Sequence, residues 1–139
     1  MVFNGVNILI NEKSWIGQTA VSSIFKSRQV ELLLAEKPLD ALDIIQKRPV
    51  HTAILDIDNE TLGAMSVMKV IRAKTPTLPC ILLSGKNEKE LLASALKLDV
   101  FSVIAKPVDL AVLQGQLHRL FTKKYNSSLF AVNSEQFTG

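Results

Sequence analysis

The chain has 139 residues, of which 47% are hydrophobic and 21% charged, a composition typical of one globular domain with a proper core. The formal net charge is +3 and the basic residues are scattered, so the sequence lacks the basic stripe of nucleic-acid-binding proteins. The single cysteine excludes an intramolecular disulfide, no apolar run is as long as a membrane span, and the first residues do not resemble a signal peptide. We therefore expect a soluble, cytoplasmic domain that binds neither membranes nor nucleic acid directly.

Strand-like and helix-like patterns alternate along the chain. Strands are expected in five short apolar runs, at residues 6–10, 30–34, 52–56, 80–83 and 100–105. Between these runs, apolar residues recur at helical spacing, as at Ile16, Ala20 and Ile24 in the first helical segment. Ser14 is expected to cap that helix, and Pro38 suits the first turn of the next one.

Five strands that alternate with five helices predict an α/β domain with a parallel sheet covered by helices on both faces. The nearly continuous apolar character of the strands agrees with burial on both faces. After Phe121 the helical pattern fades into polar residues and glycine. The sequence therefore predicts one domain over residues 1–121, followed by a flexible tail or the start of a linker over residues 122–139.

Four of the predicted strands end in residues that could carry chemistry. Asp56 ends the third strand, and Asn11 and Glu12 follow the first. Ser84 follows the fourth strand and Lys106 the fifth. Because ligands bind at the carboxyl ends of the strands in open α/β sheets, these side chains are expected to share one site. Carboxylates, a hydroxyl and an ammonium group together describe a site for a metal ion and a phosphoryl group.

With these residues in this order, the chain resembles the receiver domain of response regulators, the phospho-acceptor module of two-component signalling. The resemblance extends over residues 6–121. It implies a doubly wound, flavodoxin-like sheet with the strand order 2-1-3-4-5. It also implies that Asp56 accepts a phosphoryl group from a histidine kinase or a histidine phosphotransfer protein, forming an aspartyl phosphate.

The same resemblance assigns a Mg²⁺ site. Glu12 and Asp56 are the candidate direct ligands, and the backbone carbonyl of Asp58 and the side chain of Asn11 complete the candidate metal site. The family usually has two acids after the first strand, and Asn11 replaces one of them. Losing one charge-assisted contact costs about 1.5–3 kcal/mol, so Mg²⁺ is expected to bind weakly.

The resemblance also assigns roles to the remaining strand-end residues. Lys106 would form an ion pair with the phosphoryl oxygens, and Ser84 would hydrogen-bond to them. The peptide bond between Lys106 and Pro107 is expected to be cis, as in the family. Val103 stands where the family usually has an aromatic residue, so the usual relay from the hydroxyl group to the output surface is expected to be missing.

The sequence leaves alternatives open. The preferred hypothesis is a phosphorylatable receiver, and not an enzyme, that signals through protein contacts to an unknown output partner. A homodimer formed through the last helices is a further possibility. A degenerate receiver acting as a phosphorylation-independent interaction module is the second hypothesis, favoured by Asn11 and Val103. A third, an FMN-binding flavodoxin-like protein, depends on the loose similarity of residues 14–19 to a flavodoxin phosphate loop. Trp15, beside the site, is either a partner contact or a packed core residue.

Overall fold

Five strands form a single parallel sheet in the order β2-β1-β3-β4-β5. The structure, a computed structural model, describes residues 5–17, 19–58, 64–85 and 89–132. The strands are β1 (Val6–Ile10), β2 (Val30–Leu34), β3 (Thr52–Asp56), β4 (Cys80–Ser84) and β5 (Ser102–Ala105). The predicted fold class and strand order are therefore confirmed.

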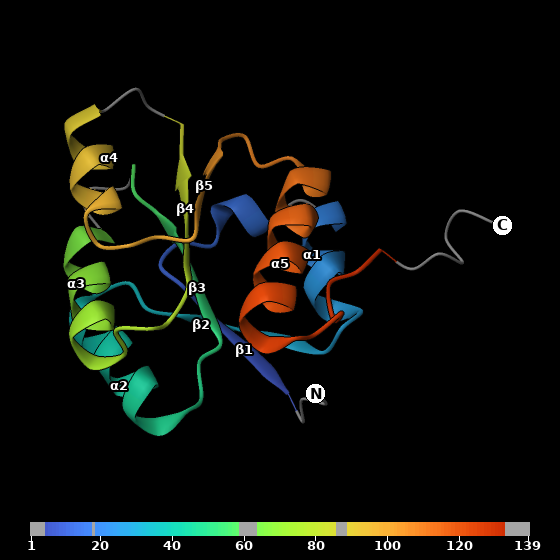
Figure 1. The fold of residues 1–139 in the computed structure, drawn as a ribbon, viewed down its shortest axis with the longest axis horizontal. Coiled ribbons are helices and arrows are strands. Elements are labelled where there is room, and N and C mark those ends of the chain that lie inside the picture. The colour runs from blue at the N-terminus through green and yellow to red at the C-terminus, as the bar shows by residue number, and fades with distance from the viewer. Residues whose placement is uncertain (1–4, 18, 59–63, 86–88, 133–139) are drawn as a thin grey trace, which may run out of the picture.

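Helices cover both faces of the sheet (Figure 1). They are α1 (Thr19–Lys26), α2 (Pro38–Lys47), α3 (Ala64–Lys74), α4 (Lys89–Leu96) and α5 (Leu110–Tyr125), with a short 3₁₀ helix, η1 (Ser14–Ile16). In Figure 1, α1 and α5 lie on one side of the sheet and α2, α3 and α4 on the other. In the part of the chain that the structure describes, no helix is both long and apolar enough to cross a membrane.

The alternation of side chains along each strand creates two hydrophobic cores. On β1, Ile8 and Ile10 pack with residues of α1 and α5, whereas Leu9 packs with residues of α2 and α3. All five residues of β1 and all five of β3 are buried. Because full burial of an aliphatic side chain stabilises a protein by about 1.5–3 kcal/mol, these two central strands anchor the sheet edge that carries the site.

Cys80 belongs to the core on the α3 side and is fully buried. Burial raises the pKa of its thiol to about 11. Its neighbours in this core are apolar side chains of the central strands and α3. The residue therefore acts as a small hydrophobic core residue, as its position in an apolar run predicts.

The entry to the first helix differs from the expectation. Ser14 begins η1 and does not cap an α-helix, because α1 begins only at Thr19. The backbone N–H and the hydroxyl group of Ser14 both donate to the carboxylate of Glu12. Pro38 does occupy the first position of α2, as predicted.

The end of the chain also differs from the expectation. Helix α5 extends to Tyr125, and Asn126 ends it in the left-handed conformation, with φ of 50°. Phe130 is fully buried, with ring centroids 6.4 Å from Phe25 and 4.9 Å from Phe121. The prediction of a flexible tail from residue 122 is therefore wrong for residues 122–132. Residues 133–139 lie outside the described part.

Arg28, in the turn after α1, holds this returning segment against the domain. The guanidinium group of Arg28 donates to the carbonyl groups of Leu129 at 2.9 Å and Ala131 at 3.3 Å. It also lies 5.7 Å from the ring centroid of Phe130, which adds a cation–π contact. Residues 126–132 are thus part of the folded domain.

Candidate functional site

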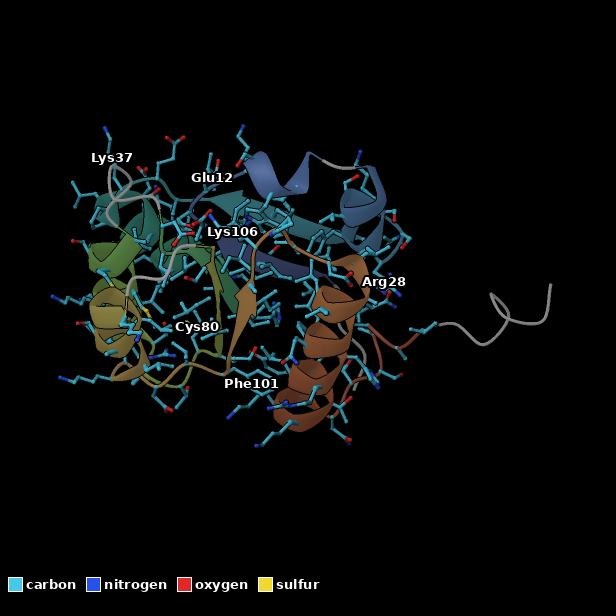
Figure 2. All side chains as sticks on the ribbon, turned by 90° about the horizontal axis from the view of Figure 1, so that it is seen from above. Glu12, Arg28, Lys37, Cys80, Phe101 and Lys106 are labelled. Atoms are coloured by element: carbon cyan, nitrogen blue, oxygen red, sulfur yellow. The ribbon has the colours of Figure 1, made fainter. Side chains whose placement is uncertain are left out.

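The residues that the sequence places at the strand ends gather at one edge of the sheet. Strands β1 and β3 are neighbours, and β4 and β5 follow on the β3 side. The chain leaves β1 toward β2 and β3 toward β4, so the switch in strand order falls between β1 and β3, where ligands bind in such sheets. Figure 2 looks down on this edge and shows Glu12 and Lys106 close together there.

Lys106 and Asp56 form the centre of the site. The ammonium nitrogen of Lys106 lies 2.9 Å and 2.8 Å from the two carboxylate oxygens of Asp56. The side chain of Asp56 is 6% exposed and that of Lys106 is 26% exposed. Such a partly buried charge-assisted contact is stronger than a surface ion pair and fixes the direction of both side chains. The Lys106–Pro107 bond is cis, as expected.

Asp58 contributes its side chain as well as its backbone. Its Oδ2 atom lies 2.9 Å from the Lys106 nitrogen and accepts from the backbone N–H of Gly85 at 2.6 Å. Its Oδ1 atom lies 3.5 Å from the hydroxyl oxygen of Ser84. Its own N–H donates to Asp56 Oδ1 at 3.0 Å. The ammonium group of Lys106 therefore forms ion pairs with two carboxylates, those of Asp56 and Asp58.

The electrostatic balance at Lys106 favours its charged form. Partial burial alone would lower its pKa, but the hydrogen bonds to Asp56 and Asp58 and their negative charges together outweigh that effect. The pKa of Lys106 is therefore raised from its usual value. The site holds a permanent cation between two acids.

Asn11, which stands where receivers usually have an acid, has a structural role in this domain. The side chain is fully buried, and its amide donates to the backbone carbonyl of Asp56 at 3.0 Å. Its carbonyl oxygen accepts from the backbone N–H of Asp56 at 2.8 Å. This reciprocal pair joins the end of β1 to the end of β3 and fixes the backbone from which the Asp56 side chain projects.

Glu12 lies at the rim of the site. Partial burial would raise its pKa, but hydrogen bonds from Ser14 and the backbone, together with the charge of Lys106, lower the pKa overall. Glu12 is therefore a carboxylate near Lys106 whose oxygens are held by Ser14. No group of three or more metal-binding acids, histidines or cysteines occurs among the described residues.

Two other residues flagged in the sequence have clear positions. Trp15 is buried and packs edge-on against Phe25, with the ring centroids 6.3 Å apart. Its surroundings agree with the interpretation as a packed aromatic residue. Val103 lies on β5 with 38% of its surface exposed. The missing aromatic relay stays a prediction.

The sequence predicts the meeting of Asp56, Ser84 and Lys106 and places Asp58 at the site, but it does not predict that the Asp58 carboxylate contacts Lys106 and the N–H of Gly85. The position of Asp58, two residues after Asp56, was the available signal. Side chains alternate along an extended strand, and a continued strand would have placed both acids on one face.

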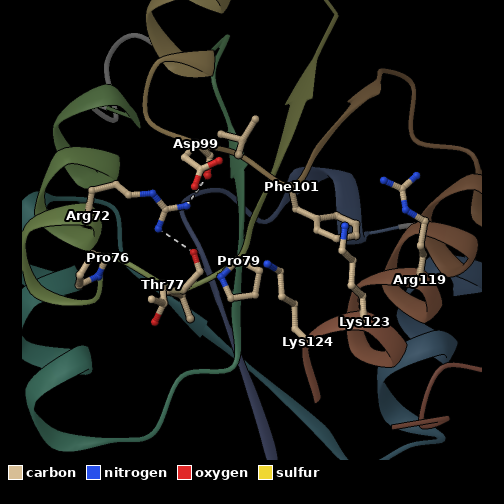
Figure 3. A pocket seen from close by; sticks show the side chains of 11 residues that line it. Arg72, Pro76, Thr77, Pro79, Asp99, Phe101, Arg119, Lys123 and Lys124 are labelled. Atoms are coloured by element: carbon tan, nitrogen blue, oxygen red, sulfur yellow. Dashed lines mark hydrogen bonds between the residues drawn. The ribbon is translucent and has the colours of Figure 1, made fainter. Parts of the chain in front are cut away.

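A separate pocket lies at the opposite edge of the sheet, near the starts of β4 and β5 (Figure 3). It has a volume of about 310 Å³. Arg119 lies over the ring of Phe101 at 4.9 Å, and Arg72 donates to backbone carbonyl groups including that of Leu78. None of the residues at the strand carboxyl ends lines this pocket. The candidate site is therefore the carboxylate–lysine cluster and not this cavity.

Comparisons with known proteins agree with the fold. A family model described as the response regulator receiver domain matches residues 8–118. A curated relative, the putative response regulator NtrX-like of Rickettsia bellii, is 26% identical over 104 residues, which are 73% of this chain and 22% of that protein. The chain thus spans about a fifth of the length of that relative.

Solved structures show the same fold. The signal receiver domain of an HD domain-containing protein from Pseudomonas fluorescens is 19% identical, with a TM-score of 0.76, and the match covers 91% of this chain and 93% of that one. The receiver domain of the sensor histidine kinase PA1611 from Pseudomonas aeruginosa, solved with a magnesium ion in its active-site cleft, is 23% identical, with a TM-score of 0.67 and coverage of 84% and 97%.

Fold and site together define a doubly wound α/β signalling domain with an acid–lysine centre at the carboxyl edge of its sheet. The chain belongs to the response regulator receiver domain family. Receiver domains are signalling modules of two-component systems, and accepting a phosphoryl group is a general property of the family.

Proposed function

We propose that this domain accepts a phosphoryl group on Asp56 from a histidine kinase or a histidine phosphotransfer protein. The observation that carries the proposal is the buried Asp56 carboxylate with the ammonium group of Lys106 at 2.8 Å. An Asp56 oxygen attacks the phosphorus atom, the phosphorus–nitrogen bond of the phosphohistidine breaks, and the imidazole leaves and takes up a proton. The product is an aspartyl phosphate whose new negative charge lies beside Lys106.

Lys106 and Ser84 would bind the transferred group. The ammonium of Lys106 neutralises phosphoryl oxygens, and the Ser84 hydroxyl, at the end of β4, donates a hydrogen bond to them. The N–H of Gly85 is a third donor in the same place. These three groups supply the electrostatic stabilisation that the phosphoryl transfer needs.

The oxygen atoms at the site are also of the chemical type that a magnesium ion prefers as ligands. Mg²⁺ prefers oxygen ligands and usually takes one or two carboxylates with water molecules. Here Asp56 and Glu12 supply carboxylates and Asp58 a backbone carbonyl, and Asn11 holds the Asp56 backbone in place. When bound, the ion would neutralise the negative charge of the phosphodonor and acceptor. With Asn11 in place of an acid, binding is expected to be weak.

Output would pass through protein contacts. Four large hydrophobic side chains on α4, β5 and α5 are exposed: Leu96, Val103, Leu110 and Val112. Exposed apolar groups on neighbouring elements support a surface for an output partner or a second copy of the chain.

The direct test is phosphorylation with a small phosphodonor such as acetyl phosphate in the presence of Mg²⁺. Wild-type protein is expected to gain the mass of one phosphoryl group, and hydroxylamine should remove it because acyl phosphates are labile to this reagent. Asp56→Asn is the matched control and should gain nothing. Equal labelling of both proteins would place the acceptor elsewhere.

A phosphorylation-independent interaction module is the second candidate. The observation in its favour is Asn11, whose amide is used in the backbone pairing with Asp56. Complete absence of labelling in wild-type protein, together with partner binding that Asp56→Asn does not change, would favour this module. The FMN-binding alternative has no supporting observation among the described residues.

A further inference from the structure

Asp58 places a carboxylate among the donors that a phosphoryl group would need. Its side chain is only 8% exposed. It accepts the Gly85 N–H at 2.6 Å, lies 2.9 Å from the Lys106 nitrogen and has Ser84 Oγ at 3.5 Å. A backbone N–H, an ammonium and a hydroxyl are the groups assigned above to the phosphoryl oxygens.

Counting donors shows that these contacts compete with a phosphoryl group. The Gly85 amide has one hydrogen, which the Asp58 carboxylate already accepts. The Lys106 ammonium has three N–H bonds and three oxygen neighbours, two from Asp56 and one from Asp58. A phosphoryl oxygen can therefore reach the Gly85 N–H only if Asp58 gives it up, and at Lys106 it must replace an oxygen of Asp56 or of Asp58.

The space beside Gly85 leads to the same conclusion. A methyl group at Gly85 would lie 3.3 Å from Asp58 Oδ2 and 3.2 Å from Lys106 Cβ. Glycine thus permits the close approach of the backbone N–H to the anion, and Asp58 and Lys106 fill the adjoining volume. A group that entered this space beside Gly85 would have to displace one of these two side chains.

We propose that Asp58 is a built-in competitor of the phosphoryl group. Its carboxylate occupies the Gly85 and Lys106 donors before phosphorylation and must leave them when Asp56 is phosphorylated. Asp58 therefore weakens the binding of a phosphoryl group at this site. This inference rests on the proposed function of Asp56.

The first measurement concerns the contact itself. In ¹⁵N-labelled protein, a short charge-assisted hydrogen bond shifts the Gly85 amide proton downfield. Asp58→Asn and Asp58→Ala should move this resonance upfield. Asp43→Asn is the matched control, because it removes an equal charge from an exposed ion pair with Lys47 on α2. An unchanged Gly85 resonance in both Asp58 variants would overturn the proposal.

The second measurement concerns competition, with beryllium fluoride and Mg²⁺ as the probe. Asp58→Asn should bind the probe about tenfold more tightly than wild-type protein, a difference of about 1.4 kcal/mol. Asp43→Asn should bind it as the wild type does. If the wild type binds and Asp58→Asn binds equally or more weakly, the competition is refuted while the proposed function stands. If neither binds, or if Asp56→Asn binds as well as the wild type, both proposals fail together.

Discussion

Replacing Asn11 with aspartate tests whether this residue has a structural role. The substitution introduces the acid that receivers usually have at this position. In the structure, however, the Asn11 amide donates to the backbone carbonyl of Asp56 at 3.0 Å in a fully buried place. A carboxylate cannot donate, so the carbonyl would lose its partner and face a negative charge. We expect Asn11→Asp to destabilise the domain in the absence of Mg²⁺.

The magnitude follows from these contacts. Leaving a buried acceptor without its donor costs about 1–3 kcal/mol, and burying the new charge adds to it, so the expected loss is about 2–4 kcal/mol. With a urea dependence of about 2 kcal/mol per M, the unfolding midpoint should fall by about 1–2 M. Trp15 is the only tryptophan and is buried, so its fluorescence can follow the transition.

The pH dependence separates loss of the donor from general damage. Burial raises the folded-state pKa of the introduced carboxyl above its unfolded value of about 3.9. The extra destabilisation is therefore absent below pH ~4 and grows as the pH rises to the folded-state pKa. At low pH the protonated carboxyl can donate to Asp56 again. Asn11→Ala has no carboxyl group at this position, so its loss of stability should not follow the titration of that group. A midpoint within about 0.2 M of the wild type at pH 7.5 would refute the structural role of Asn11, since a lost buried hydrogen bond must cost more.

Three further outcomes are expected from urea unfolding. The pKa of Lys106 is raised, so the stability that its charge contributes is fully present below pH 10.5 and is lost as the pH rises above that value. The difference in unfolding midpoint between wild type and Lys106→Met should therefore shrink from pH 8 to pH 11. A constant difference would contradict this. Burial lowers the pKa of His51, and only the neutral ring can accept the hydrogen bond from the Asn7 N–H. The wild type should therefore lose stability relative to His51→Gln as the pH falls from 7.5 to 5.5. Unfolding midpoints of the two proteins that change in parallel with pH would count against this prediction. Phe130→Ala should cost about 3–5 kcal/mol if residues 126–132 belong to the core, and a loss below about 1 kcal/mol would mean that they do not.

The sequence was sufficient for the fold and for the main strand-end residues. Strands that are buried on both faces carry nearly continuous apolar runs, so Asp56 at the end of one run and Lys106 after another were recognisable. Their meeting follows from the geometry of a parallel sheet alone. What periodicity cannot show is how Asn11 pairs with the backbone of a neighbouring strand or how Asp58 turns toward Gly85.

The returning segment after α5 was missed for a different reason. Phe130 lies in a run of only four apolar residues, 129–132, which is flanked by polar residues and too short to show a helical or strand period. Its burial depends on Phe25 and Arg28, which come from the first helix and the turn after it. Contacts between residues so far apart in sequence leave no trace in a local pattern, so only the assembled fold reveals them.

The burial of Cys80 makes this domain convenient for site-specific labelling. Its thiol lies in the core and its pKa is raised to about 11, so thiol-reactive probes should modify it only when the domain opens. A cysteine introduced at an exposed position such as Val112 could then carry a fluorophore or spin label on an unaltered background. The rate at which thiol reagents modify Cys80 would report the rate at which the sheet opens around it.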